Sequence, residues 1–264
     1  MIKVIKSRPT LEKLLKHLSR KEKCAYVRTG DGDINLLNGE NDSYNRCTDD
    51  FKHEMKEVFE LSDPNFMKCL PLYIGDNAEP NMCPGNHLCD ISFYNHIISK
   101  VGTYIQYFPS VYSHVSLCYQ ATYDPEYAIH FLKELKKACL VNSTYVIGNS
   151  TTSTELIRLF FGNNINRILT DSKDSYANIN TVWNTISNSI NKDRYTIFII
   201  FMGCAGRPLQ KRIWKTYDNV FIFDVGSLMD AISGQDTRAW IKISGFNPNQ
   251  FLQLCEKELI SIVD

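Results

Sequence analysis

The second half of the chain alternates strongly apolar segments with amphipathic ones, and this alternation most constrains the fold. Segments such as "RYTIFIIFMG" and "NVFIFDVG" are almost continuously apolar, and helical patterns such as "RPLQKRIWKTY" lie between them. Strands that are apolar on both faces and separated by helices are typical of a parallel sheet covered on both sides. The pattern therefore predicts an α/β, Rossmann-like fold with a mostly parallel sheet and helices on both faces.

The first half fits the same architecture. "CAYVR" and "KCLPLYIGD" have the composition of buried strands, and residues 113–121, "SHVSLCYQA", resemble a further strand. Residues 1–23 are predicted to be an N-terminal helical extension with Thr10 as the N-cap, because an apolar face of leucines follows. Residues 75–92, rich in Gly, Pro and Asn, are predicted to form a long loop near the active site. We expect one domain over residues 1–264.

Charge and hydropathy exclude some classes of function. Lys plus Arg equals Asp plus Glu at 29 each, so the basic excess of a general nucleic-acid binder is missing. No apolar run approaches the roughly 20 residues that span a membrane, and the N-terminus lacks a signal-peptide pattern. We expect a soluble intracellular protein whose anionic ligand is a small molecule.

Polar and glycine-rich loops follow the predicted strands. "RTGDGD" follows residues 24–28, "GNSTTS" follows 145–147, "TDSKDSY" follows 167–169 and "MGCAGR" follows 195–202, with "DVGSLMD" after 220–223 as a fifth loop. Ligands of open α/β sheets bind beyond the carboxyl ends of the strands. The loops are therefore expected to open on one edge and to form one site.

Asp31 and Asp33 are two carboxylates separated by a single glycine. Mg²⁺ and Mn²⁺ bind to one or two carboxylates and fill their other positions with water and phosphate oxygens. A metal site is one interpretation of this pair, and a simple Asp-Gly turn is the other.

Three other loops suit phosphate binding, although a dinucleotide-type GxGxxG is missing. Arg207 lies before a helix, where it either binds phosphate in a bidentate manner or is an ordinary surface arginine at a helix start. Asn149 lies in a loop rich in hydroxyls, which either binds an anion or merely caps the next helix through Ser150 or Thr151. Lys173 and Ser175 suit contacts with phosphate, beside a tyrosine that suits stacking on a base.

The sequence resembles the GT-D-fold glycosyltransferases, once a domain of unknown function. "RTGDGD" is similar to their Arg-x-Gly-Asp-Gly-Glu motif, and "RILTDSKDSY" to a segment that ends in Ser-Lys-Asn-Ala-Phe. The segments "IIFMGCAGRPLQKRIWK" and "VFIFDVGSLMDAISG" resemble the closing strand-helix-strand, which ends in Asp-Ile-Gly-His. The resemblance covers residues 24–234.

The resemblance implies a Rossmann-like glycosyltransferase that uses a UDP-sugar donor, a divalent metal (Mn²⁺ or Mg²⁺) and a glycan or glycoprotein acceptor. It implies that Asp31 and Asp33 hold the metal and that Arg28 lies beside the donor phosphates. Together with the loop analysis it places donor-binding residues at Arg28, Thr29, Gly30, Asn149, Lys173, Ser175, Gly203, Arg207 and Asp224. A base for the acceptor hydroxyl is needed if the reaction inverts, and Asp230 and Asp76 are the candidates.

This sequence departs from the family pattern at three points. Asp33 replaces the Glu, Asp174-Ser175-Tyr176 replaces Asn-Ala-Phe, and Ser227 replaces the His. Two alternatives therefore stay open. One is a Rossmann-type sugar methyltransferase, and the other is a subunit that binds a nucleotide or sugar without catalysis.

Overall fold

The computed structural model describes residues 4–72, 91–235 and 239–262 of the 264-residue chain. The predicted loop 75–92, with Asp76, therefore lies almost wholly outside the described residues. In the described part, eight strands form one sheet in the order β1-β4-β3-β2-β8-β7-β5-β6, and every neighbouring pair is parallel. The strands are β1 (Val4–Ile5), β2 (Cys24–Arg28), β3 (Phe66–Leu70), β4 (Val111–Ser113), β5 (Ser143–Asn149), β6 (Asn166–Thr170), β7 (Thr196–Phe201) and β8 (Val220–Asp224).

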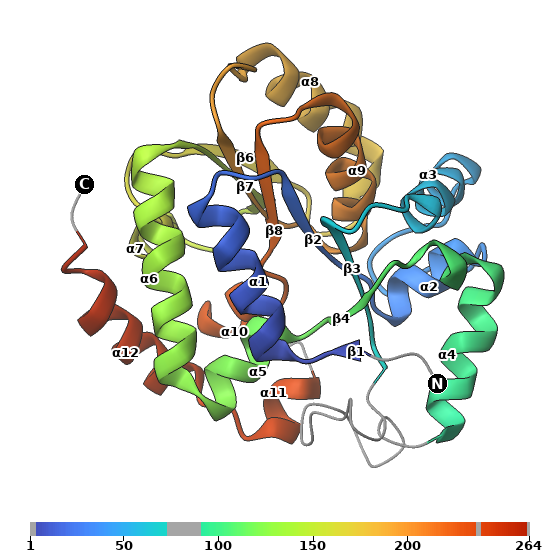
Figure 1. The fold of residues 1–264 in the computed structure, drawn as a ribbon, viewed down its shortest axis with the longest axis horizontal. Helices are drawn as coiled ribbons and strands as arrows, with labels where there is room; N and C mark the ends of the chain where they lie inside the picture. The colour runs from blue at the N-terminus through green and yellow to red at the C-terminus, as the bar shows by residue number, and fades with distance from the viewer. Residues whose placement is uncertain (1–3, 73–90, 236–238, 263–264) are drawn as a thin grey trace.

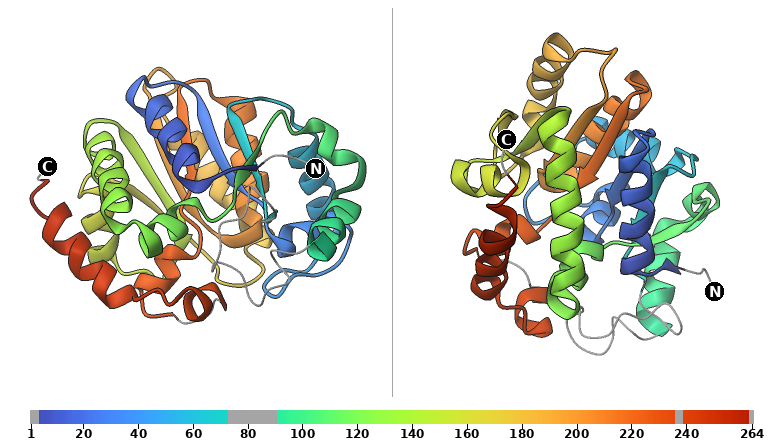
Figure 2. Two further views of the ribbon diagram at one scale, coloured as in Figure 1. Left: turned by 60° about the horizontal axis from the view of Figure 1, so that its bottom comes forward. Right: turned by 60° about the vertical axis from the view of Figure 1, so that its left-hand side comes forward.

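Helices cover both faces of the sheet, as Figures 1 and 2 show. One face packs against α1 (Ser7–Ser19), α5 (Ser116–Tyr123), α6 (Pro125–Val141), α7 (Thr154–Phe161), α10 (Leu228–Ile232), α11 (Ala239–Ser244) and α12 (Pro248–Leu259). The other packs against α2 (Asp31–Leu37), α3 (Asp49–Glu60), α4 (Ile91–Val101), α8 (Ile179–Ser189) and α9 (Gly206–Thr216). Short 3₁₀ helices are η3 (Gly102–Tyr107), η4 (Ser175–Asn178) and η5 (Gly203–Ala205). The predicted α/β fold is confirmed, and its sheet is entirely parallel.

Two local predictions are wrong. Residues 116–123 form helix α5, and β4 ends at Ser113. A short apolar run suits a buried helix as well as a strand, and this one packs against α1 and α6. The N-cap of α1 is Lys6 and not the predicted Thr10. The helix can start before Pro9 because proline is tolerated in the first turn. The hydroxyl of Thr10 donates a hydrogen bond to the carbonyl of Lys6 at 2.8 Å. The predicted helical extension also contributes β1, which pairs with β4.

The strand order places a topological switch point between β2 and β8. The chain leaving β2 turns towards β3, whereas the chain leaving β8 turns through α10 towards α12, which packs on α6 and α7. Figure 1 shows α10 beyond the end of β8. Adjacent strands whose connections leave in opposite directions open a crevice at their carboxyl ends, where ligands of such sheets bind. Within the described residues, no helix combines the length and apolarity needed to cross a bilayer.

Candidate active site

The turn after β2 separates the two carboxylates of the "GDGD" motif. Gly30 is the N-cap of α2 in an extended conformation, so Asp31 is the first helical residue and Asp33 the third. The Oδ2 atom of Asp33 accepts a hydrogen bond from the backbone N–H of Gly30 at 2.8 Å. This is the return contact of a capping box. Asp33 is only 3% exposed, whereas Asp31 lies on the surface.

Gly32, between the two acids, lies in a tightly packed place. A Cβ at this position would lie 3.1 Å from the Sγ of Cys204 and 3.3 Å from the Cβ of Asp42. The start of α2 therefore lies close to η5 and to the loop that follows α2. This close approach favours a small residue at position 32.

A chain of alternating charges lies beneath this turn. The Nε atom of Arg207 lies 3.1 Å from Oδ1 of Asp33, and its Nη1 donates to Asp224. The Nη1 of Arg28 lies 3.7 Å from the other oxygen of Asp224. The Asp33–Arg207–Asp224–Arg28 chain connects the ends of β2 and β8 to the start of α9. These two strands border the switch point.

In this charge chain, burial disfavours the charged form of each side chain, whereas ion pairing favours it. Burial raises the pKa of Asp33 overall, although Arg207 and the N–H of Gly30 pull it down in part. Burial disfavours the charge of Arg207, yet Asp224 and Asp33 raise its pKa overall. Burial also disfavours the charge of Arg28, but Asp224, together with Cys118 and Tyr26, raises its pKa overall. Both arginines are therefore charged, and each depends on a carboxylate of the chain.

Gly226 makes room for Arg28. It has a φ of +61°, and a Cβ there would lie 1.0 Å from Nη1 of Arg28. The Nε of the same guanidinium donates to the backbone carbonyl of His114, which follows β4. The ends of three strands therefore fix the position of Arg28 at the carboxyl edge.

The sequence model of the family described as "Glycosyltransferase GT-D fold" matches residues 26–231, which include all four members of the charge chain. The chain belongs to this GT-D-fold family. Among curated proteins, none matches the sequence.

Three solved structures resemble the GT-D-fold protein described here. A selenomethionine-substituted domain of unknown function 1792 has 19% identity and a TM-score of 0.62 over 85% of this chain and 78% of its own. A structure of the same domain, described as having a distinct glycosyltransferase fold, has 19% identity and a TM-score of 0.60 with the same coverage. A glycosyltransferase of this kind from Streptococcus sanguinis has 17% identity and a TM-score of 0.59 over 84% and 81%. These likenesses show a shared fold.

The other predicted residues of this GT-D-fold chain lie on neighbouring loops. The hydroxyl of Thr29 donates to the carbonyl of Cys69 and is buried, so it faces the sheet. Ser175 is buried too, and its hydroxyl lies 3.4 Å from the carbonyl of Met202, so the loops after β6 and β7 meet. Gly203 directly follows Met202, has a φ of +59°, and faces open space on its Cβ side.

Three predicted residues lie on elements that contribute no member of the charge chain. Lys173 is exposed on the loop after β6, and Asp230 is half-buried on α10. Asn149 accepts a hydrogen bond from the N–H of Thr151 at 3.0 Å at the end of β5. The predicted cap of the next helix is wrong, because the N-cap of α7 is Ser153, which accepts from the N–H of Leu156.

Two residues of the site were not predicted from sequence. His114 follows β4, and burial together with Arg28 and Arg207 holds its pKa well below the usual value, so its imidazole is neutral at pH 7. Cys204 lies against Gly32, and burial holds its thiol pKa well above the ordinary value. Cys204 lies in the "MGCAGR" loop, but its residue type indicated no role there, and His114 belongs to no motif of the site. The strand order brings both residues to the edge.

The fit of a divalent metal is limited by Asp33. Its Oδ1 is fully enclosed and faces Arg207, and its Oδ2 accepts from Gly30. In residues 4–72, 91–235 and 239–262, no cluster of three or more Asp, Glu, His or Cys could hold a metal ion. A site with one carboxylate does fit, because Mg²⁺ and similar ions bind to one or two carboxylates and to substrate phosphates. Asp31 is the exposed carboxylate of the motif.

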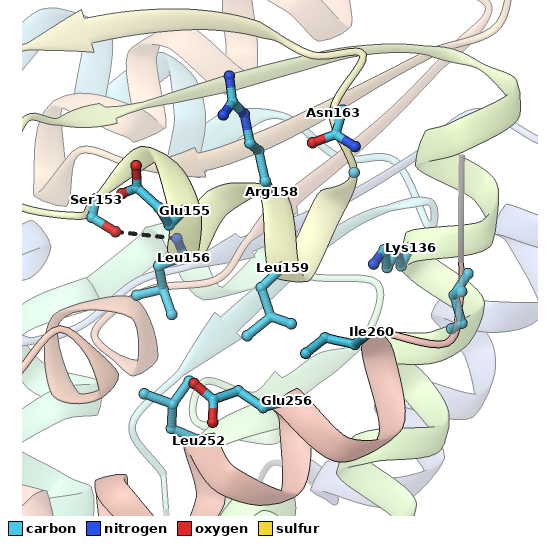
Figure 3. Close-up of a pocket in the computed structure, with 12 residues that line it drawn as sticks. Lys136, Ser153, Glu155, Leu156, Arg158, Leu159, Asn163, Leu252, Glu256 and Ile260 are labelled. Carbon is cyan, nitrogen blue, oxygen red and sulfur yellow. Dashed lines mark hydrogen bonds between the residues drawn. The ribbon is translucent and has the colours of Figure 1, made fainter.

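A separate groove of about 540 Å³ lies between α7 and α12. Figure 3 shows Leu156 and Leu159 of α7 facing Leu252 and Ile260 across it, with Glu155, Arg158 and Glu256 around them. Among the described residues that line the groove, none was predicted as a site residue. The groove is therefore distinct from the charge chain.

Proposed function

We propose that this chain transfers a hexose or a pentose from a UDP-sugar to a hydroxyl of a glycan or glycoprotein acceptor. The observation that supports this most is the position of Arg28 and Asp31 on one turn at the β2/β8 switch point of a GT-D-fold protein. A cation and an exposed carboxylate at this switch point suit a diphosphate and the metal ion that accompanies it.

Arg28 is the better placed of the two buried arginines to contact a donor phosphate. Its side chain is 14% exposed and its distance to Asp224 is 3.7 Å, whereas Arg207 is 8% exposed and bonded to two carboxylates. A fixed cation at the switch point stabilises the charge that builds on the departing diphosphate without reorganisation. Arg207 would then affect the donor only indirectly, through its ion pairs with Asp224 and Asp33.

A divalent cation, Mn²⁺ or Mg²⁺, would be held by Asp31 with water and donor oxygens. When bound, such an ion supplies Lewis-acid stabilisation of the leaving diphosphate. Ser175, Gly203 and Lys173 belong to the loops after β6 and β7, where a nucleoside would lie in this proposal. Asp230 stays the candidate for the base that accepts the proton of the acceptor hydroxyl.

A binding subunit without catalysis is the second candidate. The observation that favours it is the ion pair of Asp33 with Arg207, because it removes one of the two acids on which a two-carboxylate metal site depends. The methyltransferase alternative has no such support, since the family match is to a glycosyltransferase fold.

Slow donor hydrolysis without an acceptor tests the two candidates. The protein is incubated with Mn²⁺ and each of several UDP-sugars, and the released UDP is measured. We expect release from at least one donor and a loss of about 10-fold or more in Asp31→Asn. Lys16→Asn, a change at an exposed position on α1, is the control and should hydrolyse the donor normally. UDP binding without hydrolysis of any donor would instead support the binding subunit.

A further inference from the structure

The spacing of Asp31 and Asp33 on α2 directs their side chains apart. They are the first and third residues of the helix. Each residue of an α-helix turns by about 100°, so side chains two positions apart diverge by about 200° and do not face each other. One carboxylate therefore points to the surface and the other into the protein.

Both oxygens of Asp33 already have partners inside the protein. Oδ2 accepts from the N–H of Gly30 at 2.8 Å, and Oδ1 lies 3.1 Å from Nε of Arg207. The contact between Oδ1 and this Nε is an ion pair without the geometry of a hydrogen bond. Neither atom has a hydrogen-bond partner among the described residues, so the ion pair compensates for their burial. A cation that bound to Oδ1 would have to displace Arg207 from an enclosed position.

Arg207 in turn needs Asp33. It is 7% exposed, and the two carboxylates that balance it are Asp33 and Asp224. Asp224 also faces Arg28, so two arginines share it. Without Asp33, one carboxylate would serve two buried guanidinium groups, and burial of an unbalanced charge is strongly unfavourable.

We propose that Asp33 is the internal counter-ion of Arg207 and that Asp31 is the motif carboxylate that faces the ligand. Asp33 then holds the turn at residues 29–30 and the start of α9 together through Arg207. The role of Asp31 rests on the function proposed above, whereas the role of Asp33 does not.

The first experiment measures the melting temperature of the metal-free protein. Asp33→Asn keeps the volume and the acceptor for Gly30 but removes the charge, so Tm should fall by about 4–10 °C. The matched control Asp31→Asn should change Tm by no more than about 2 °C, since Asp31 is exposed. An unchanged or raised Tm in Asp33→Asn overturns the proposal, because an acid reserved for a cation is destabilising when no cation is bound.

A double-variant cycle tests the partner. In the Arg207→Gln background, Asp33 and Asp224 are left without the cation between them. Asp33→Asn should then leave Tm unchanged or raise it, the opposite of its effect in the parent. A fall in Tm of the same size in both backgrounds would show that Asp33 acts independently of Arg207 and would contradict the proposal.

The second experiment titrates Mn²⁺ in the presence of UDP by following free Mn²⁺ with electron paramagnetic resonance. Asp31→Asn should weaken Mn²⁺ binding by about 10-fold or more, and Asp33→Asn by less than about 3-fold. Equal losses of Mn²⁺ affinity in the two variants would show that Asp33 is a metal ligand and would overturn the proposal. Should Asp33→Asn fail to fold, the double variant Asp33→Asn/Arg207→Gln replaces it, since it removes the carboxylate and its cation together and is also expected to change the affinity less than about 3-fold.

The two experiments separate the two proposals. If the parent protein does not bind Mn²⁺ with UDP at all, the proposed function fails and with it the role of Asp31. The Tm cycle uses no ligand, so it still decides whether Asp33 is the counter-ion of Arg207.

Discussion

At the residue scale, Gly226 shows how closely the carboxyl edge is packed around Arg28. The backbone of Gly226 is in the left-handed region at φ +61°, and the guanidinium of Arg28 occupies the space of its missing side chain. Both the conformation and the contact require glycine. Gly234 has a similar φ of +80°, but nothing lies within 4 Å of its Cβ position. A substitution at Gly234 therefore reports the backbone strain alone, without a steric contact.

Gly226→Ala is therefore expected to destabilise the protein more than Gly234→Ala. The backbone penalty of about 1 kcal/mol is common to both, and the clash with Arg28 adds about 2–3 kcal/mol at Gly226 alone. Urea denaturation followed by circular dichroism measures both variants. Equal losses of stability would show that Arg28 does not lie against Gly226.

Residue patterns predicted the members of the charge chain but not their pairing. Arg28, Asp33, Arg207 and Asp224 were all predicted as site residues, yet the sequence contains no sign that Asp33 faces Arg207, 174 positions away. The sequence allows two interpretations of the motif, a metal site formed by both acids and a simple Asp-Gly turn, and the first assumes that carboxylates close in sequence are close in space. The helical geometry of α2, which starts at Asp31, separates them.

At the element scale, a cluster of ion pairs joins α3 to α9. Glu54 of α3 accepts from Lys211 at 2.9 Å and from Arg212, both on α9. It also accepts from the hydroxyl of Tyr176 at 2.9 Å. The ring of Tyr176 stacks on Phe51 with centroids 4.0 Å apart. One face of the tyrosine that was predicted to stack on a base is therefore occupied, and η4 is attached to α3.

Glu54 makes stability depend on pH. Burial raises its pKa, but the bonds from Arg212 and Lys211 outweigh this and lower it from 4.5 to about 2. Because the pKa is lower in the folded state, the stabilisation is complete above about pH 4.5 and is lost as the pH falls towards 2. Glu54→Gln should cost about 1–3 kcal/mol at pH 7 and almost nothing at pH 2.

Denaturation at several pH values checks this prediction. Glu60→Gln, at an exposed position in the same helix, is the control and should change stability by less than about 0.5 kcal/mol at every pH. If the difference in the free energy of unfolding between Glu54→Gln and the parent stays constant from pH 7 to pH 2, Glu54 is not the source of the pH dependence.

Elements with long, strong patterns were predicted best. β7 and β8 are buried over their whole length, as their apolar runs predicted. Helix α5 was missed because it has only eight residues, and its apolar residues show no clear helical period. The strand β1 has two residues and depends on pairing with β4, which lies more than 100 positions later, so no local pattern could reveal it.

At the scale of the whole molecule, the order of the strands decides where the site lies. β2 lies between β3 and β8, which places the loop after residue 28 beside the loop after residue 224. The alternation of strands and helices predicted the parallel sheet, but many strand orders share that alternation. The site could therefore be predicted to lie at the carboxyl edge, while its two strands could not.

The binding of UDP to the whole protein tests the central claim most directly. Calorimetric titration of UDP is carried out with and without Mn²⁺ on the parent and on Asp31→Asn. We expect binding by the parent that Mn²⁺ tightens by about 10-fold or more, and we expect Asp31→Asn to lose this response. The absence of UDP binding under both conditions, or binding that Mn²⁺ does not change, would contradict the proposal of a metal-assisted nucleotide-sugar site at the β2/β8 switch point.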